Sequence, residues 1–161
     1  MLYDNTYVNI DLDAILANFE AVRSKTKAPV MAIIKADAYG HGAVQIARLL
    51  EERVAFFGVS GVGEALELRQ SGLEKPILIL GHTPTAAYPQ IVALGIRPAI
   101  FCLEDAELLS KEAVRQRTTA KFHLAVDTGM SRLGFQCTRA DAAVCAQATR
   151  LPGLQAEGLF S

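Results

Sequence analysis

Hydrophobic residues along this chain alternate between the spacing typical of helices and that of buried strands. The first helical pattern covers Leu12–Ser24, where the apolar residues recur on one face: Leu12, Ile15, Leu16, Phe19 and Val22. Asp11 precedes this segment, and its carboxylate can accept hydrogen bonds from the free N–H groups of a first turn. A short alternating segment, Tyr7–Ile10, predicts a strand before the helix.

The pattern changes after Pro29. Val30–Ile34 is an unbroken apolar run rich in β-branched residues, which predicts a strand buried on both faces and ending at Lys35. We expect a loop next, because Gly40 and Gly42 follow closely, and then a helix over Ala43–Glu52.

The alternation then repeats to the last residue of the sequence. Further strands are predicted at Phe56–Ser60, Ile77–Leu80, Ile96–Phe101, Lys121–Val126 and Leu154–Phe160, and further helices at Gly63–Gln70, Ala87–Leu94, Glu104–Arg115 and Thr138–Ala148. Six strands separated by five helices predict an α/β fold with a parallel sheet. Either an open doubly wound sheet or part of a closed (β/α)₈ barrel fits, and both place the site at the carboxyl ends of the strands.

Composition agrees with one folded domain. The chain has 161 residues, of which 51% are hydrophobic and 20% charged, so a core can form. The net charge of −1 argues against nucleic acid or anionic lipid as a partner. Apolar runs stay far below the roughly 20 residues of a membrane helix, and the first residues carry no secretory pattern. Three cysteines without C-x-x-C spacing favour a reduced, cytoplasmic protein.

The residues that follow each strand are the candidates for chemistry. Lys35 ends the first buried strand, where a partly desolvated amine suits Schiff-base chemistry, although a solvated strand-end lysine explains the same position. Ala32–Lys35 also looks like the kinase V-A-I-K strand, but the other kinase motifs are absent. Gly58–Gly63 has the order G-x-x-G-x-G, which is not the dinucleotide fingerprint and is better explained as a tight turn.

A second candidate segment follows the strand at Lys121–Val126. Asp127-Thr128-Gly129 looks like an aspartic-protease motif, but such proteases need two carboxylates and an all-β chain. The remaining explanation is a strand-end loop that delivers Arg132, whose guanidinium can hold a carboxylate with two hydrogen bonds. A surface arginine with a structural role fits equally well.

The histidines and cysteines predict no metal site. His41, His82 and His123 lack metal-ligand spacing, and His123, inside a strand, is interpreted as a packed residue. Cys102 stands at a strand end but is better explained as a small buried hydrophobic residue.

Two segments together resemble a known family. Ile34-Lys35-Ala36-Asp37-Ala38-Tyr39-Gly40-His41-Gly42 resembles the pyridoxal-phosphate lysine motif of alanine racemases. The segment Val126–Phe135, VDTGMSRLGF, resembles their second signature. Tyr7–Ile15 and Glu157–Ser161 are similar to the family's opening and sixth-strand segments, so the resemblance covers essentially the whole chain in order.

The resemblance implies roles for three residues. Lys35 would form a Schiff base with pyridoxal 5'-phosphate and act as catalytic acid or base on one face of the substrate α-carbon. Tyr39 would contact the cofactor phosphate region. Arg132 would bond the cofactor's phenolic oxygen and help hold the substrate carboxylate. The implied enzyme is an isomerase that interconverts L- and D-alanine for peptidoglycan, in the cytoplasm and as a homodimer.

Two departures from the family pattern stand out. Many racemases have a lysine two residues before the D-T-G aspartate, and Ala125 stands there in this chain. The sequence also stops at Ser161, so we expect residues 1–161 to form a truncated N-terminal barrel domain without strands 7 and 8 or the C-terminal β domain. The partner subunit's catalytic tyrosine is absent as well. We therefore expect this segment to be inactive alone. The alternative to a racemase segment is a non-catalytic cofactor-binding or assembly module of the same fold. Specificity for alanine, for serine or for a broader set of substrates stays open.

Overall fold

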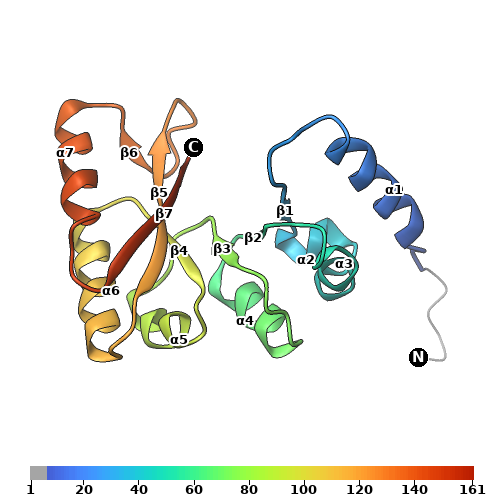
Figure 1. Cartoon of the computed structure of the whole chain (residues 1–161), viewed down its shortest axis with the longest axis horizontal. Helices are drawn as coiled ribbons and strands as arrows, with labels where there is room; N and C mark the ends of the chain where they lie inside the picture. The colour runs from blue at the N-terminus through green and yellow to red at the C-terminus, as the bar shows by residue number, and fades with distance from the viewer. Residues whose placement is uncertain (1–6) are drawn as a thin grey trace.

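The computed structural model describes residues 7–161, which form a seven-stranded parallel sheet with helices along it (Figure 1). The strands are β1 (Met31–Ile33), β2 (Phe56–Val59), β3 (Ile77–Ile79), β4 (Arg97–Ile100), β5 (Ala120–Asp127), β6 (Phe135–Gln136) and β7 (Leu154–Phe160). The helices are α1 (Leu12–Arg23), α2 (Lys35–Gly40), α3 (Ala43–Leu50), α4 (Val62–Gln70), α5 (Tyr88–Ala93), α6 (Leu103–Arg115) and α7 (Arg139–Ala148), with a 3₁₀ turn, η1 (Thr85–Ala87).

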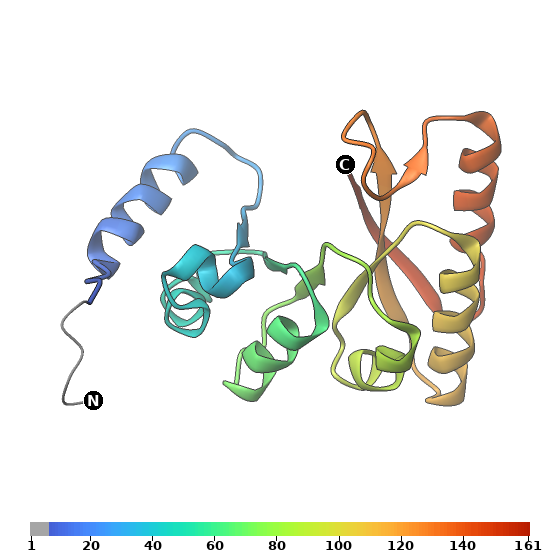
Figure 2. The ribbon, with the colours of Figure 1, turned by 180° about the vertical axis from the view of Figure 1, so that it is seen from behind.

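The order of the strands decides between the two expected architectures. Each main strand pairs with its predecessor in the chain, in the order β1-β2-β3-β4-β5, and β7 then pairs with β5. A doubly wound sheet reverses its strand order at a switch point, whereas this sheet does not. Figure 2 shows the same elements from behind, with β1 and β7 at opposite ends of the curved sheet. The α/β prediction and the partial barrel are therefore confirmed.

Strand alternation divides the buried residues between two sides of the sheet. Phe57, Val59, Ile77, Ile79 and Phe122 face the helices and are fully buried, as the continuous apolar runs predict. Burying each such side chain stabilises the fold by about 1.5–3 kcal/mol. The intervening positions face the barrel interior, where Gly58 has no side chain; a Cβ there would lie 2.5 Å from the Cδ1 of Ile33.

The structure departs from the local predictions at three places. Tyr7–Ile10 has no strand structure, because its backbone pairs with no strand among the described residues. The expected loop after Lys35 contains the short helix α2. The sequence patterns also did not predict strand β6, which follows the loop after β5 and pairs with Val126 and Asp127.

Candidate functional site

The carboxyl ends of the strands surround a cavity of about 680 Å³. This size is within the range of small-molecule sites. Its walls come from β1, β3, β5 and β7 and from the loop between β5 and β6. They are formed by Met31, Ile33, Lys35, Leu78, Leu80, His123, Ala125, Val126, Asp127, Thr128, Met130, Arg132, Leu133, Gly158, Leu159, Phe160 and Ser161.

Lys35 reaches this cavity because of strand periodicity and an unusual turn. Met31, Ile33 and Lys35 alternate along one face and all line the cavity, whereas Ile34 is 3% exposed on the other face. Directly after Lys35 the backbone becomes left-handed: Ala36–Tyr39 have φ between 51° and 56°. A left-handed conformation costs roughly 1–2 kcal/mol for each non-glycine residue, so the four together cost about 4–8 kcal/mol. Such strain is typical of functional sites.

Hydrogen bonds close the left-handed turn onto the next helix. The backbone N–H of Gly42 donates to the carbonyl of Asp37 at 2.9 Å, and the N–H of Ala43 donates to the Asp37 side chain at 2.6 Å. Asp37 thus satisfies a free donor at the start of α3, where Gly42, at φ 89°, has no side chain to do so. The C-terminal end of the turn is therefore fixed to the start of α3.

The loop that carries Arg132 is organised by Asp127. Its carboxylate accepts hydrogen bonds from the backbone N–H groups of Gly129 and Ser131, both at 2.9 Å, and from the Gln136 side chain at 3.1 Å. These bonds lower the pKa of Asp127 to about 2. Gly134 is required at the end of the loop, because a Cβ there would lie 2.5 Å from the Asp127 nitrogen.

The structure brings two of the three predicted site residues together. Lys35 and Arg132 line the same cavity from different strands, although they are far apart in sequence. Tyr39 is 62% exposed and does not line that cavity. Within residues 7–161 neither Lys35 nor Arg132 takes part in an ion pair, so both cationic groups are available to a ligand.

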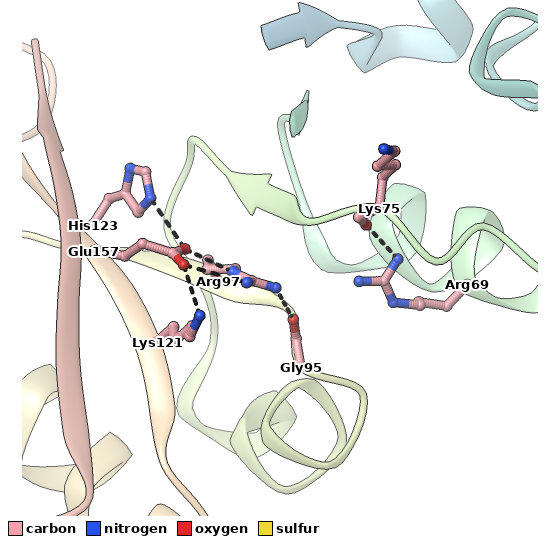
Figure 3. Close-up of polar contacts among 7 residues, drawn as sticks. All are labelled: Arg69, Lys75, Gly95, Arg97, Lys121, His123 and Glu157. Atoms are coloured by element: carbon pink, nitrogen blue, oxygen red, sulfur yellow. Dashed lines mark hydrogen bonds and ion pairs between the residues drawn. The ribbon is translucent and has the colours of Figure 1, made fainter. Parts of the chain in front are cut away.

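A polar cluster, Arg97, Lys121, His123 and Glu157, joins strands β4, β5 and β7 (Figure 3). The Glu157 carboxylate accepts from Arg97 Nε and Lys121 Nζ, each at 2.9 Å. Burial raises the pKa of Glu157, but the hydrogen bonds and charges of Arg97 and Lys121 outweigh it and bring that pKa to about 2. His123 links this cluster to the cavity, since it lines the cavity and its Nε2 lies 3.8 Å from Glu157.

The spacing of residues did not reveal this cluster, and it led to the interpretation of His123 as only a packed residue. The ring does pack, edge-on to Phe56 with centroids 5.6 Å apart. Lys121 and His123 are two apart in the strand, which is a signal that they share the inner face, but the pairing with Glu157 needs the register of β7. Burial lowers the pKa of His123, which keeps the ring neutral at neutral pH.

Neither a metal cluster nor a membrane-spanning helix is present in the described part of the chain. No three His, Cys, Asp or Glu side chains among residues 7–161 are grouped so that they could hold a metal ion. No helix described there has both the length and the apolar character needed to cross a membrane.

Comparison with known proteins gives consistent matches. The family model "Alanine racemase, N-terminal domain" matches residues 10–161. Alanine racemase 1 of Clostridium acetobutylicum is 39% identical over 157 residues, 96% of this chain and 41% of that protein. The solved alanine racemase of Clostridium difficile 630 has a TM-score of 0.94 at 34% identity, covering 99% of this chain and 43% of that one. A histidine racemase of Leuconostoc mesenteroides subsp. sake has a TM-score of 0.81 at 28% identity, covering 89% of this chain and 39% of its own. The chain thus spans about two fifths of the length of these relatives.

Proposed function

Because this chain belongs to the alanine racemase family, through its N-terminal domain, we propose that it forms the lysine-bearing part of an enzyme that interconverts L- and D-alanine. Residues 1–161 would be the N-terminal part of the barrel domain. The observation that carries the proposal is the convergence of Lys35 and Arg132 on one cavity at the carboxyl ends of the strands.

The residues of this cavity fit pyridoxal phosphate as the cofactor. Lys35 offers a primary amine, the only side-chain group that forms a Schiff base with a carbonyl compound. Leu78, Leu80 and Met31 offer apolar surface for an aromatic ring, and Arg132 offers donors to an anionic oxygen. When bound, pyridoxal phosphate supplies an electron sink for the negative charge left on the substrate α-carbon after proton removal.

Two cavity residues would then have defined tasks. Lys35 would hold the cofactor and carry a proton at its Nζ on one face of the substrate. Arg132 would orient the substrate carboxylate, a task that suits the planar guanidinium. The role of Tyr39 at the cofactor phosphate stays a prediction, which Tyr39→Phe tests.

Racemisation needs a second proton carrier on the opposite face of the α-carbon, because inversion requires removal on one side and return on the other. We propose that a second subunit of a homodimer supplies it.

Ala125, 4% exposed in the cavity wall, has no polar group with which to support Arg132. The proposed setting is the cytoplasm, where the three free cysteines stay reduced and D-alanine for peptidoglycan is made.

Borohydride trapping tests the cofactor site. The purified chain is mixed with pyridoxal phosphate, reduced and mapped by peptide mass spectrometry, and we expect the pyridoxyl label on Lys35. Lys35→Ala should abolish the label, whereas Lys111→Ala, at an exposed lysine on α6, should retain it. If both variants carry the pyridoxyl label on lysines other than Lys35, the assignment of Lys35 as the cofactor site is overturned.

Two activity measurements separate an enzyme from a non-catalytic module. We expect residues 1–161 alone to produce no D-alanine, and the protein extended to the length of its relatives to racemise alanine. Exchange of the α-proton of alanine with solvent deuterium, without inversion, would indicate that this part performs half of the reaction. A panel of L-alanine, L-serine and L-histidine tests the substrate, since the histidine racemase shares this fold.

A further inference from the structure

Glu64 on helix α4 makes hydrogen bonds to two loops at the carboxyl ends of the strands. One carboxylate oxygen, Oε1, accepts from the backbone N–H of Ala36 at 2.7 Å. The other, Oε2, accepts from the N–H of Ser60 at 2.6 Å and from the Ser60 hydroxyl at 2.8 Å. Glu64 therefore connects the turn after β1 with the loop after β2.

The contact with Ala36 is at the point where the left-handed turn begins. Ala36 directly follows Lys35 and is the first of the four strained residues. Asp37 fastens the far end of the turn to α3, and Glu64 is the side chain that fastens its start. The two carboxylates thus hold opposite ends of the turn that directly follows Lys35.

Local capping of α4 does not account for this arrangement. A glutamate at the third position of a helix often bonds the backbone at its own helix start, and the weak contact with the Gly61 N–H at 3.4 Å is of that kind. The shorter bond to Ala36 spans 28 residues of sequence. Burial raises the pKa of Glu64, but the hydrogen bonds from Ala36, Ser60 and Gly61 outweigh it, so the carboxylate is ionised at neutral pH.

We propose that Glu64 is a positioning residue for Lys35: it holds the left-handed turn so that the lysine amine stays in the cavity and reacts with the cofactor. This inference rests on the proposed function, because it assigns Lys35 as the reacting group. The chemistry requires a carboxylate, since only a carboxylate offers two acceptor oxygens to two separate sets of donors. A glutamine must turn its NH₂ group toward one set.

Three variants separate positioning from capping. Glu64→Gln loses one acceptor oxygen. Glu64→Asp keeps the charge and can still cap α4, but it is one methylene too short to reach Ala36. Glu67→Gln removes the same charge from an exposed position on the same helix and is the matched control. Glu64→Asp also keeps the test decisive if Glu64→Gln does not fold.

Two readouts are measured on the purified chain: amide hydrogen exchange of residues 34–42, and the rate of pyridoxyl labelling at Lys35. In both Glu64 variants we expect exchange at Ala36 to be roughly tenfold faster or more, because a hydrogen bond to a charged group is lost. We also expect labelling at Lys35 to fall severalfold. Glu67→Gln should match the wild type in both.

The outcomes separate this inference from the proposed function. If the wild type is not labelled at Lys35, the proposed function fails and the positioning role fails with it. If the wild type is labelled and the Glu64 variants label Lys35 equally fast, only the positioning role is overturned. Faster exchange at Ala36 with unchanged labelling also overturns the positioning role, because the turn would then matter to the fold and not to the lysine.

Discussion

Replacing Glu157 with glutamine tests whether the polar cluster stabilises the barrel interior. The substitution keeps the side-chain volume but removes the negative charge that Arg97 and Lys121 share. The Glu157 and Arg97 side chains are only 22% and 13% exposed, so their desolvated charges depend on each other. Lys121 is 41% exposed, and its contribution is reduced by solvent screening.

The size of the loss follows from these contacts. A hydrogen bond to a charged group contributes about 1.5–3 kcal/mol when buried, and an exposed ion pair contributes about 0–1 kcal/mol. Because glutamine keeps one acceptor oxygen, we expect Glu157→Gln to lower the free energy of unfolding by about 1–3 kcal/mol at pH 7. The midpoint of thermal unfolding should fall by about 2–12 °C for a chain of this length.

The pH dependence supplies a sharper signature than the loss itself. The pKa of Glu157 is lowered from 4.5 to about 2, so the folded protein binds fewer protons there than the unfolded chain does. Its stabilising contribution is complete above pH 4.5 and disappears as the pH falls toward 2. The difference between wild type and variant should therefore shrink over that interval.

The assay is urea unfolding followed by circular dichroism at several pH values between 7 and 2.5. Glu20→Gln is the control, because Glu20 forms an exposed pair with Arg53 at 3.9 Å and its loss should change the free energy by less than about 1 kcal/mol. The reasoning is refuted if Glu157→Gln is as stable as the wild type at pH 7, or if its deficit stays constant down to pH 2.5.

Three further predictions concern the turn, the loop and the histidine. Ala36→Gly should leave the free energy of unfolding unchanged or raise it by up to about 1 kcal/mol, because glycine adopts the left-handed conformation without strain. The control Ala17→Gly, in the middle of α1, should lower the free energy of unfolding by about 1 kcal/mol. Equal losses for the two variants in urea unfolding would contradict the strain argument. Gly134→Ala should lower the free energy of unfolding by more than about 1 kcal/mol, since the new Cβ would collide with the backbone at Asp127; a thermal midpoint equal to that of the wild type would show that the loop can shift at no cost. Because burial lowers the pKa of His123 below 6.5, the wild type should lose up to about 1 kcal/mol per pH unit as the pH falls below 6.5, and His123→Gln should lose less; parallel stability curves would contradict this.

The repeated alternation of strands and helices was predictable from the sequence because each segment's hydrophobic spacing is local. The predicted ends of the strands pointed to Lys35 and to the loop that carries Arg132. The family resemblance then implied roles for these two residues. The left-handed turn was not predictable from Ala36–Tyr39, since alanine and tyrosine favour the right-handed region. Only the nearby glycines, Gly40 and Gly42, are a local sign of it.

Contacts between distant segments explain the other failures. Tyr7–Ile10 alternates as a strand does, but alternation alone cannot supply a neighbouring strand to pair with. Glu64 bonds a residue 28 positions away, and Glu157 meets Arg97 across 60 positions. Such pairs are fixed by strand register and helix packing, which the spacing of residues within one segment does not encode.

The consecutive order of the strands has a consequence for how the protein is made. Each main strand pairs with one that the ribosome has already released, so the sheet can grow in the direction of synthesis without waiting for a distant partner. The two cavity cations are nevertheless 97 residues apart, from position 35 to position 132. At a synthesis rate of about 5–20 residues per second, Lys35 is synthesised several seconds or more before Arg132. The nascent chain therefore contains the residues of the left-handed turn well before the cavity can have its second cation.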